Sequence, residues 1–303
     1  MTIPPTAEIQ RIVYLGTPAA AVPPLRALCG AGYEIGLVVS RPDTRRGRGG
    51  TLQPSPVKAA ALDLGLDVSD DLEDLAGVSA DLGVVVAFGE IIPPALLEQL
   101  SMVNIHFSLL PRWRGAAPVE RAILAGDEVT GVSLMAVDDG LDTGAIYRRA
   151  EISIDSDEES GALRARLIKL GTEVLIEALA EGLGEPEPQI GEPVYARKIT
   201  AEDRHIDWTQ PAVQIHRQVR VGGAWTTFRD QQFKIWRTAV DDSPVAPDAD
   251  RQRAGLPGAI SGLSVATGEG RIDLLEVQAQ GRTRQVAFAW HNGVRLTPED
   301  RFV

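Results

Sequence analysis

The sequence has a single cysteine, Cys29, among its 303 residues. It therefore has no internal disulfide, which fits a reducing compartment. Cys29 lies in an apolar helical pattern, so we interpret it as a packing residue. No apolar run reaches the roughly 18 residues that a membrane helix needs, and the first residues lack the basic-then-apolar order of a secretory signal. We expect a cytoplasmic protein with no membrane partner.

Common nucleotide and metal motifs are also missing. The apolar segment 11–16 ends in Gly-Thr-Pro rather than in Gly-x-Gly-x-x-Gly, and the phosphate-binding pattern Gly-x-x-x-x-Gly-Lys-Ser/Thr does not occur. The four histidines and one cysteine are scattered, so they show no zinc-ligand spacing. We expect no metal, and a doubly wound fold would not here imply a dinucleotide or ATP.

The charge balance is acidic, with a formal net charge of −12. Such a surface argues against broad, non-specific binding of nucleic acid. The segment 41–58, "RPDTRRGRGGTLQPSPVK", is an exception because it carries five cations and one acid. A basic segment on an acidic chain is a candidate for attracting one particular anionic partner.

Short apolar segments alternate with helical patterns through the first part of the chain. We predict strands at 11–16, 34–40, 82–89, 103–107, 131–137 and 145–152, and helices at 19–30, 55–64, 93–100 and about 157–182. Nearly continuous Val, Ile and Leu runs are typical of strands covered on both faces. The sequence therefore predicts an α/β fold with a doubly wound, mostly parallel sheet.

The composition changes in "EGLGEPEPQIGEPVYARKI" (181–199), whose Gly, Pro and Glu content indicates an extended linker. Beyond the linker we predict short strands at 233–238, 257–266, 272–278 and 285–290. Their spacing favours a small all-β barrel or sandwich, and we expect an OB-like barrel. The predicted division is a first domain over 1–184, a linker over 185–202 and a second domain over 203–303.

Polar side chains gather near the end of the predicted strand 103–107. Asn104 and His106 are two residues apart, so they project to the same face, near the strand end where open α/β sheets place ligands. The glycine-rich loop "DDGLDTGAI" (138–146) adds Asp142. An Asn amide donates to a developing oxyanion, a His moves a proton and an Asp orients the His, so this set is suited to acyl transfer. A hydrogen-bonded structural pair beside a solvated acidic turn is the alternative.

Several segments resemble the methionyl-tRNA formyltransferase family. They follow one another along nearly the whole chain: "IVYLGTP", "RPDTRRGRGGTLQPSPVK", "VVVAFGEIIPPALLE", "NIHFSLLPRWRGAAPVERAILAGD", "TGVSLMAVDDGLDTGAI" and "YARKITAEDRHIDWT". The resemblance implies an enzyme of translation initiation. Its reaction would move a formyl group from 10-formyltetrahydrofolate to the amino group of methionyl initiator tRNA.

The resemblance also implies roles for individual residues. Asn104, His106 and Asp142 would be catalytic. The folate co-substrate would contact two segments, Val86, Ala87, Phe88, Gly89, Glu90 and Ile91, and Ser108, Leu109, Leu110 and Pro111. Arg45, Arg46 and Arg48 would contact the acceptor end of the tRNA, and the second domain would hold the tRNA body. We expect a monomer.

Three positions depart from the usual pattern of the family. Phe107 stands where a small residue is common, Ser101 replaces a common Gly, and "VRVGGAWTTF" (219–228) lacks the usual Asn-Pro-Trp-Pro. A bulky ring at position 107 would narrow a pocket for the aminoacyl group. The alternatives are a formyltransferase that acts on an amino sugar nucleotide, a non-catalytic folate- or tRNA-binding relative, and a hydrolase that transfers formyl to water.

Overall fold

The computed structural model describes residues 9–46, 50–241, 256–297 and 299–303. The chain divides into two compact units, and each is discontinuous in sequence. The first unit comprises Met1–Pro118, Val129–Ser153 and Arg164–Ala196, and the second comprises Val119–Glu128, Ile154–Leu163 and Arg197–Val303. The division at 184 and 203 expected from the sequence stays a prediction.

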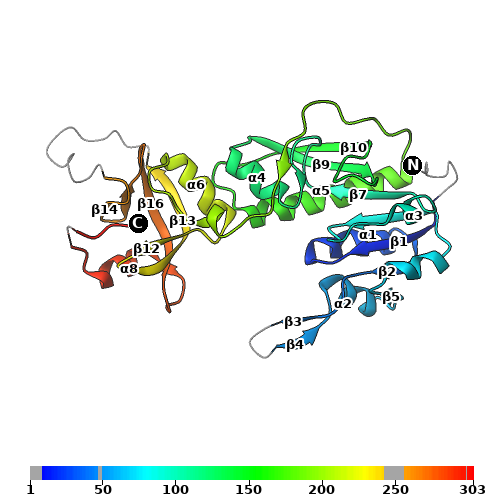
Figure 1. The fold of residues 1–303 in the computed structure, drawn as a ribbon, viewed down its shortest axis with the longest axis horizontal. Helices are drawn as coiled ribbons and strands as arrows, with labels where there is room; N and C mark the ends of the chain where they lie inside the picture. The colour runs from blue at the N-terminus through cyan, green and yellow to red at the C-terminus, as the bar shows by residue number, and fades with distance from the viewer. Residues whose placement is uncertain (1–8, 47–49, 242–255, 298) are drawn as a thin grey trace. The chain divides into compact units, whose positions relative to one another are not determined.

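A seven-stranded sheet forms the centre of the first unit, in the order β10-β9-β7-β6-β1-β2-β5 (Figure 1). Its strands are β1 (Arg11–Gly16), β2 (Glu34–Val39), β5 (Val68–Ser69), β6 (Leu82–Val86), β7 (Met102–His106), β9 (Val129–Ala136) and β10 (Ile146–Ser153). All neighbours from β5 to β7 pair in parallel, whereas β9 is antiparallel to both β7 and β10. The mostly parallel α/β sheet predicted from the sequence is confirmed.

Helices and short strands complete this part of the chain. They are η1 (Ala19–Ala21), α1 (Val22–Gly30), α2 (Pro56–Asp63), η2 (Leu72–Gly77), α3 (Pro94–Leu97), β8 (Arg114–Gly115), β11 (Tyr195–Ala196) and most of α5 (Ser160–Glu181). Helix α4 (Pro118–Ala125) belongs, apart from Pro118, to the second unit. Helix α5 approaches β7 closely at Gly171, where an added Cβ would lie 2.6 Å from Cγ2 of Ile105. A glycine at this position therefore sets the distance between the helix and the strand.

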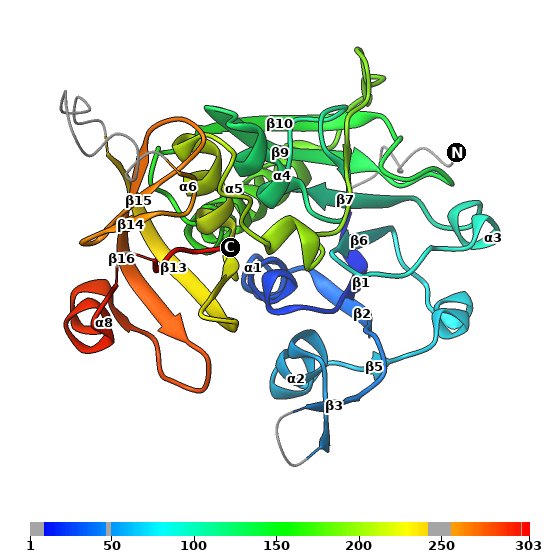
Figure 2. The same cartoon turned by 60° about the vertical axis from the view of Figure 1, so that its left-hand side comes forward.

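The basic segment contains a small hairpin that the sequence analysis did not predict. Strands β3 (Thr44–Arg46) and β4 (Thr51–Gln53) pair in antiparallel fashion. Both views show the hairpin extending beyond α2, away from the central sheet (Figures 1 and 2). Its base is tied down because Nζ of Lys58 lies 2.7 Å from Oδ1 of Asp43.

The second unit contains a six-stranded antiparallel sheet. This confirms the predicted β-strand domain, but no strand was predicted at Trp225–Phe228. Its elements are η3 (Glu202–Arg204), α6 (Ala212–Val221), β12 (Trp225–Phe228), β13 (Gln231–Asp241), β14 (Ile260–Ser261), β15 (Ser264–Ala266), β16 (Arg271–Ala279), β17 (Gln285–Val286) and α8 (Ala287–Val294). The expected strand at 285–290 is correct only for its first two residues, because helix α8 begins at Ala287.

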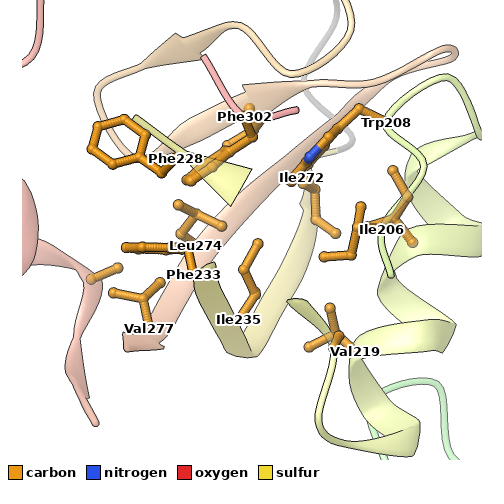
Figure 3. Packing of buried hydrophobic residues seen from close by; sticks show 14 of the residues in the cluster. Ile206, Trp208, Val219, Phe228, Phe233, Ile235, Ile272, Leu274, Val277 and Phe302 are labelled. Atoms are coloured by element: carbon orange, nitrogen blue, oxygen red, sulfur yellow. The ribbon is translucent and has the colours of Figure 1, made fainter. Parts of the chain in front are cut away.

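Aromatic and aliphatic side chains of these elements and of the segments around Trp208 and Phe302 form one core (Figure 3). Phe233 and Phe302 are each 1% exposed, and their ring centroids are 5.1 Å apart. Trp208 stacks on Phe302 at 5.3 Å. In the described parts of the chain, no helix is both long enough and apolar enough to cross a membrane.

Candidate active site

Strand β7 directs Ile105 to one face and Asn104 and His106 to the other. Ile105 and Phe107 both lie close to Gly171 of α5, at 2.6 and 3.7 Å from the position that a Cβ would take there. Alternation along the strand therefore directs Asn104 and His106 to the other face. The Phe107 ring lies beside α5. It therefore does not narrow the face of β7 that carries Asn104 and His106.

Asn104 is half-buried near the carboxyl end of β7. It is paired with Val85 on β6, so it lies beside the loop that follows β6. Within the described residues its side-chain amide makes no hydrogen bond. A half-buried amide whose donors are not used by the protein is available to a ligand.

His106 is 6% exposed, and its two ring nitrogens face different groups. Its Nε2 lies 2.8 Å from the carbonyl oxygen of Trp113, and its Nδ1 lies 3.5 Å from Oδ1 of Asp142. Because a carbonyl only accepts hydrogen bonds, Nε2 carries a proton and donates a hydrogen bond to the Trp113 carbonyl. The nitrogen that faces Asp142 is therefore the one that can gain or lose a proton.

Asp142 approaches His106 from a loop that begins near the other end of β7. The pairing of β7 with β9 places Ala136 opposite Val103, so the β9–β10 loop starts beside the first half of β7. The loop must fold back for its carboxylate to approach His106. Asp142 adopts a left-handed backbone, with φ of 52°, and its Oδ2 accepts a 2.7 Å hydrogen bond from the amide of Gly115. Asp138 shapes the same loop by accepting from the Thr143 hydroxyl at 2.7 Å.

The first predicted folate segment follows β6 directly. Val86 is fully buried at the end of the strand, and Phe88 packs into the core beneath the sheet at 4% exposure. Ala87 and Gly89 both have positive φ, 47° and 82°, which turns the main chain sharply. The turn leaves Ile91 85% exposed. Two further contacts hold the loop: Thr17 donates to the Phe88 carbonyl at 2.7 Å, and Arg41 pairs with Glu90 at 2.6 Å.

The second predicted folate segment, Ser108–Pro111, is fixed mainly through its main chain. The buried hydroxyl of Ser133 donates to the Ser108 carbonyl at 2.8 Å and accepts from the Leu110 amide at 3.2 Å. Ser108 itself donates to the carbonyl of Arg112 at 2.6 Å. Leu110 is buried, whereas Leu109 and Pro111 are partly exposed.

The three predicted tRNA-contacting arginines belong to the β3–β4 segment. Arg45 is exposed, and its Nη1 donates to the carbonyl of Gly50 at 3.0 Å. Arg46 ends β3, and Arg48 lies outside the described residues. No group of three or more His, Cys, Asp or Glu residues in the described part of the chain is placed to hold a metal ion.

Sequence reasoning missed the groups that hold the trio in place. The Trp113 carbonyl and the Gly115 amide act through the main chain, so side-chain patterns give no signal for them. Gln189 lies in the segment interpreted as a linker, yet its side-chain amide donates to the carbonyls of Asp142 and Gly144, both at 2.8 Å. No spacing in the sequence connects position 189 with position 142.

Two consecutive parts of the chain match known protein families. Residues 10–179 match the formyl transferase family, and residues 198–295 match the formyl transferase C-terminal domain. The chain is 42% identical to the methionyl-tRNA formyltransferase of Ruegeria pomeroyi, over 93% of this chain and 97% of that one. It is 39% identical to the enzyme of Streptomyces coelicolor, over 96% and 99%. The chain belongs to the methionyl-tRNA formyltransferase family.

Solved structures of two formyltransferases and of HypX share the fold. The N-formyltransferase of Helicobacter canadensis, in complex with folinic acid and dTDP-3-aminofucose, matches with a TM-score of 0.67 at 17% identity, over 89% of this chain and 99% of that one. The methionyl-tRNA formyltransferase of Clostridium thermocellum matches with a TM-score of 0.57 at 16% identity, over 79% and 97%. HypX from Aquifex aeolicus, in complex with tetrahydrofolic acid, matches with a TM-score of 0.64 at 17% identity, over 95% and 47%.

Proposed function

We propose that this protein transfers a formyl group from 10-formyltetrahydrofolate to the amino group of methionyl initiator tRNA. Membership of the methionyl-tRNA formyltransferase family supports the reaction. The observation that carries the assignment of the site is the His106–Asp142 pair, at 3.5 Å. His106 lies on the same face of β7 as the Asn104 amide, to which no described residue is hydrogen-bonded.

The reaction sets two demands on the protein. Bound 10-formyltetrahydrofolate supplies a formyl carbon attached to a folate nitrogen. A carbon–nitrogen bond to the amine forms, the bond to the folate nitrogen breaks, and one proton passes from the amine to the folate nitrogen. The site must therefore stabilise negative charge on the formyl oxygen and hold a proton in transit.

Asn104 meets the first demand. Its amide is half-buried near the carboxyl end of β7 and donates to no protein group among the described residues. A donor that is already positioned stabilises a developing oxyanion without reorganising. Such a donor typically lowers the activation free energy by about 3 kcal/mol. We assign Asn104 this role.

His106 and Asp142 meet the second demand. Since Nε2 donates to the Trp113 carbonyl, Nδ1 and Oδ1 of Asp142 face each other as two acceptors unless a proton lies between them. The pair can therefore take the proton from the attacking amine and return it to the leaving nitrogen. Asp142 also stabilises the positive charge on the imidazole while the proton is held.

The folate is assigned to the loop after β6 and to Ser108–Pro111. Residues 87–91 are suited to a flat heterocycle because the turn exposes main-chain polar groups next to the apolar side chain of Ile91, which is 85% exposed. Val85 opposite Asn104 places the start of this loop next to the proposed oxyanion donor. The arginines of the β3–β4 segment are assigned to the phosphates of the tRNA acceptor end.

The experiment that tests the proposal offers the purified protein 10-formyltetrahydrofolate with charged methionyl initiator tRNA. We expect formyl-methionyl-tRNA and tetrahydrofolate in equal amounts. Parallel reactions with an amino sugar nucleotide and without any amine measure the two alternative acceptors. Faster turnover of the sugar, or release of formate at the same rate without tRNA, would contradict the proposal.

A further inference from the structure

The side chain of Gln189 uses its whole hydrogen-bonding capacity beside the proposed site. Its Nε2 donates to the carbonyls of Asp142 and Gly144, both at 2.8 Å. Its Oε1 accepts from Nε of Arg114 at 3.0 Å and from Nη2 at 2.6 Å. One amide therefore joins the β9–β10 loop to the segment that follows the proposed folate contacts.

Gln189 connects two chain segments, and both of them position the carboxylate of Asp142. One is the loop backbone at Asp142, which stands in the left-handed region with φ of 52°. The other is the segment containing Arg114, whose neighbour Gly115 donates to Oδ2 of Asp142 at 2.7 Å. Arg114 is fixed in turn by β8–β11 pairing, in which its amide donates to the Val194 carbonyl at 2.9 Å.

We propose that Gln189 is a positioning residue for formyl transfer, holding the Asp142 carboxylate beside Nδ1 of His106, where it stabilises the proton that this nitrogen takes up. The inference rests on the proposed function. It adds a role for a residue of the segment 185–202, which the sequence alone indicates only as a connector. Gln189 touches no reacting atom in this scheme and acts entirely through Asp142.

Glutamine is suited to this position because the two sides of its amide have opposite polarity. Two loop carbonyls require donors, and the Arg114 guanidinium requires an acceptor. Gln189→Met keeps the length and loses both sets of bonds. Gln189→Glu keeps the acceptor for Arg114 but turns an anion toward two carbonyl oxygens. The matched control is Ile190→Ala, because Ile190 is the next residue and is 84% exposed.

The first measurement is steady-state formylation of methionyl-tRNA by Gln189→Met, Gln189→Glu and Ile190→Ala. We expect both Gln189 variants to lower kcat by about tenfold to a hundredfold, since a small misplacement of a reacting group has effects of that order. KM for tRNA and for folate should change less than about threefold, because neither substrate contact is touched. The pH profile of kcat should also shift in these variants, and Ile190→Ala should behave as wild type.

The double variant Gln189→Met with Asp142→Asn distinguishes a role that acts through Asp142 from a purely structural role of Gln189. If Gln189 acts through Asp142, the double variant has nearly the rate of Asp142→Asn alone. Independent, multiplicative losses in the double variant would overturn the inference, as would a wild-type kcat in Gln189→Met. Wild-type activity of Asp142→Asn would instead refute the proposed site, so the two failures are distinguishable.

A spectroscopic measurement covers the case in which Gln189→Met folds poorly. The chain has four histidines, so the ring nitrogens of His106 can be followed by ¹⁵N NMR after histidine labelling. Arg114→Lys leaves Gln189 in place but removes its forked donor, so the His106 signals should move while those of His205, His216 and His291 stay unchanged. Unchanged His106 signals in folded Arg114→Lys and Gln189→Glu would overturn the inference.

Discussion

The Nδ1 atom of His106 lies 3.5 Å from a carboxylate oxygen of Asp142, while the other ring nitrogen is bound to the Trp113 carbonyl. The main chain, rather than the carboxylate, therefore fixes which ring nitrogen is protonated at rest. Asp142 is left free to respond to the charge on Nδ1. This differs from a triad in which the carboxylate orients one nitrogen and the other is open to substrate.

Replacing the imidazole should remove the proton carrier without disturbing the sheet. We expect His106→Ala to lower kcat by more than about a hundredfold, which is the usual contribution of a positioned acid–base group. The measurement is the rate of formyl-methionyl-tRNA formation at saturating folate. His291→Ala is the control, since this residue lies in α8 of the second unit. A wild-type rate in His106→Ala would show that the pair is structural.

Local patterns were enough to predict half of this site. Asn104 and His106 follow from the period of a strand, which places i and i+2 on one face whatever surrounds them. The glycine-rich loop and the resemblance to a family both indicate Asp142, but no local pattern shows that it approaches His106, because its loop starts beside Val103 and must fold back. Gln189 carries no signal, since no spacing in the sequence connects it with Arg114 or with the two carbonyls that it binds.

For the fold, too, local patterns predict only those elements that their residues determine unambiguously. Long apolar runs gave the central strands to within a few residues, since only one local structure suits them. "QVAFAW" (285–290) is short and suits two structures. Ala287 and Trp290 are buried while Phe288 is 63% exposed, which is helical spacing. The monomeric state and cytoplasmic location expected from the sequence stay predictions.

The contact between α5 and β7 gives a sharp test of the sheet geometry. Gly171→Ala would place a Cβ 2.6 Å from Cγ2 of Ile105, so the strand or the helix must shift. We expect a loss of unfolding free energy of about 1–3 kcal/mol, as for other overpacked cores. Because Ile105 lies between Asn104 and His106, kcat should fall as well. Chemical denaturation and the formylation rate measure the two effects.

Gly161 in the same helix provides the matched control. A Cβ there would meet no atom within 4 Å. Gly161→Ala should therefore stabilise the protein by about 0.5–1 kcal/mol, the difference in helix propensity, and leave kcat unchanged. Equal behaviour of the two alanine variants would mean that α5 does not pack on β7 as described.

The β3–β4 segment should contribute electrostatically to tRNA binding. Changing Arg45, Arg46 and Arg48 together to Ala should weaken binding and reduce the slope of log K against log salt by about two, the value for three contacts with a single-stranded end. Arg26→Ala removes an exposed cation of α1 and should leave the slope intact. A triple variant with the wild-type slope would show that these arginines do not meet phosphates.

An ion pair joins Arg121 of α4 to Asp203 of η3. Nη1 and Nη2 of Arg121 donate to the two carboxylate oxygens of Asp203 at 2.8 and 2.9 Å. Thr200 adds two donors to the same carboxylate. These bonds, chiefly those from Arg121, lower the pKa of Asp203 from 3.8 to about 2.

A lowered pKa of Asp203 means that its ionised form stabilises the folded state. The contribution, at most about 2 kcal/mol, is complete above the ordinary pKa near 3.8 and disappears as the pH falls toward about 2. Asp203→Asn should therefore lower the urea midpoint at pH 7, and its difference from wild type should shrink between about pH 4 and pH 2.

Tryptophan fluorescence reports mainly the second unit, which contains Trp208, Trp225, Trp236 and Trp290. Glu202→Gln, at an exposed neighbouring position, should change neither value. A difference between Asp203→Asn and wild type that is the same at pH 7 and pH 3 would mean that the stabilisation does not depend on the charge of Asp203.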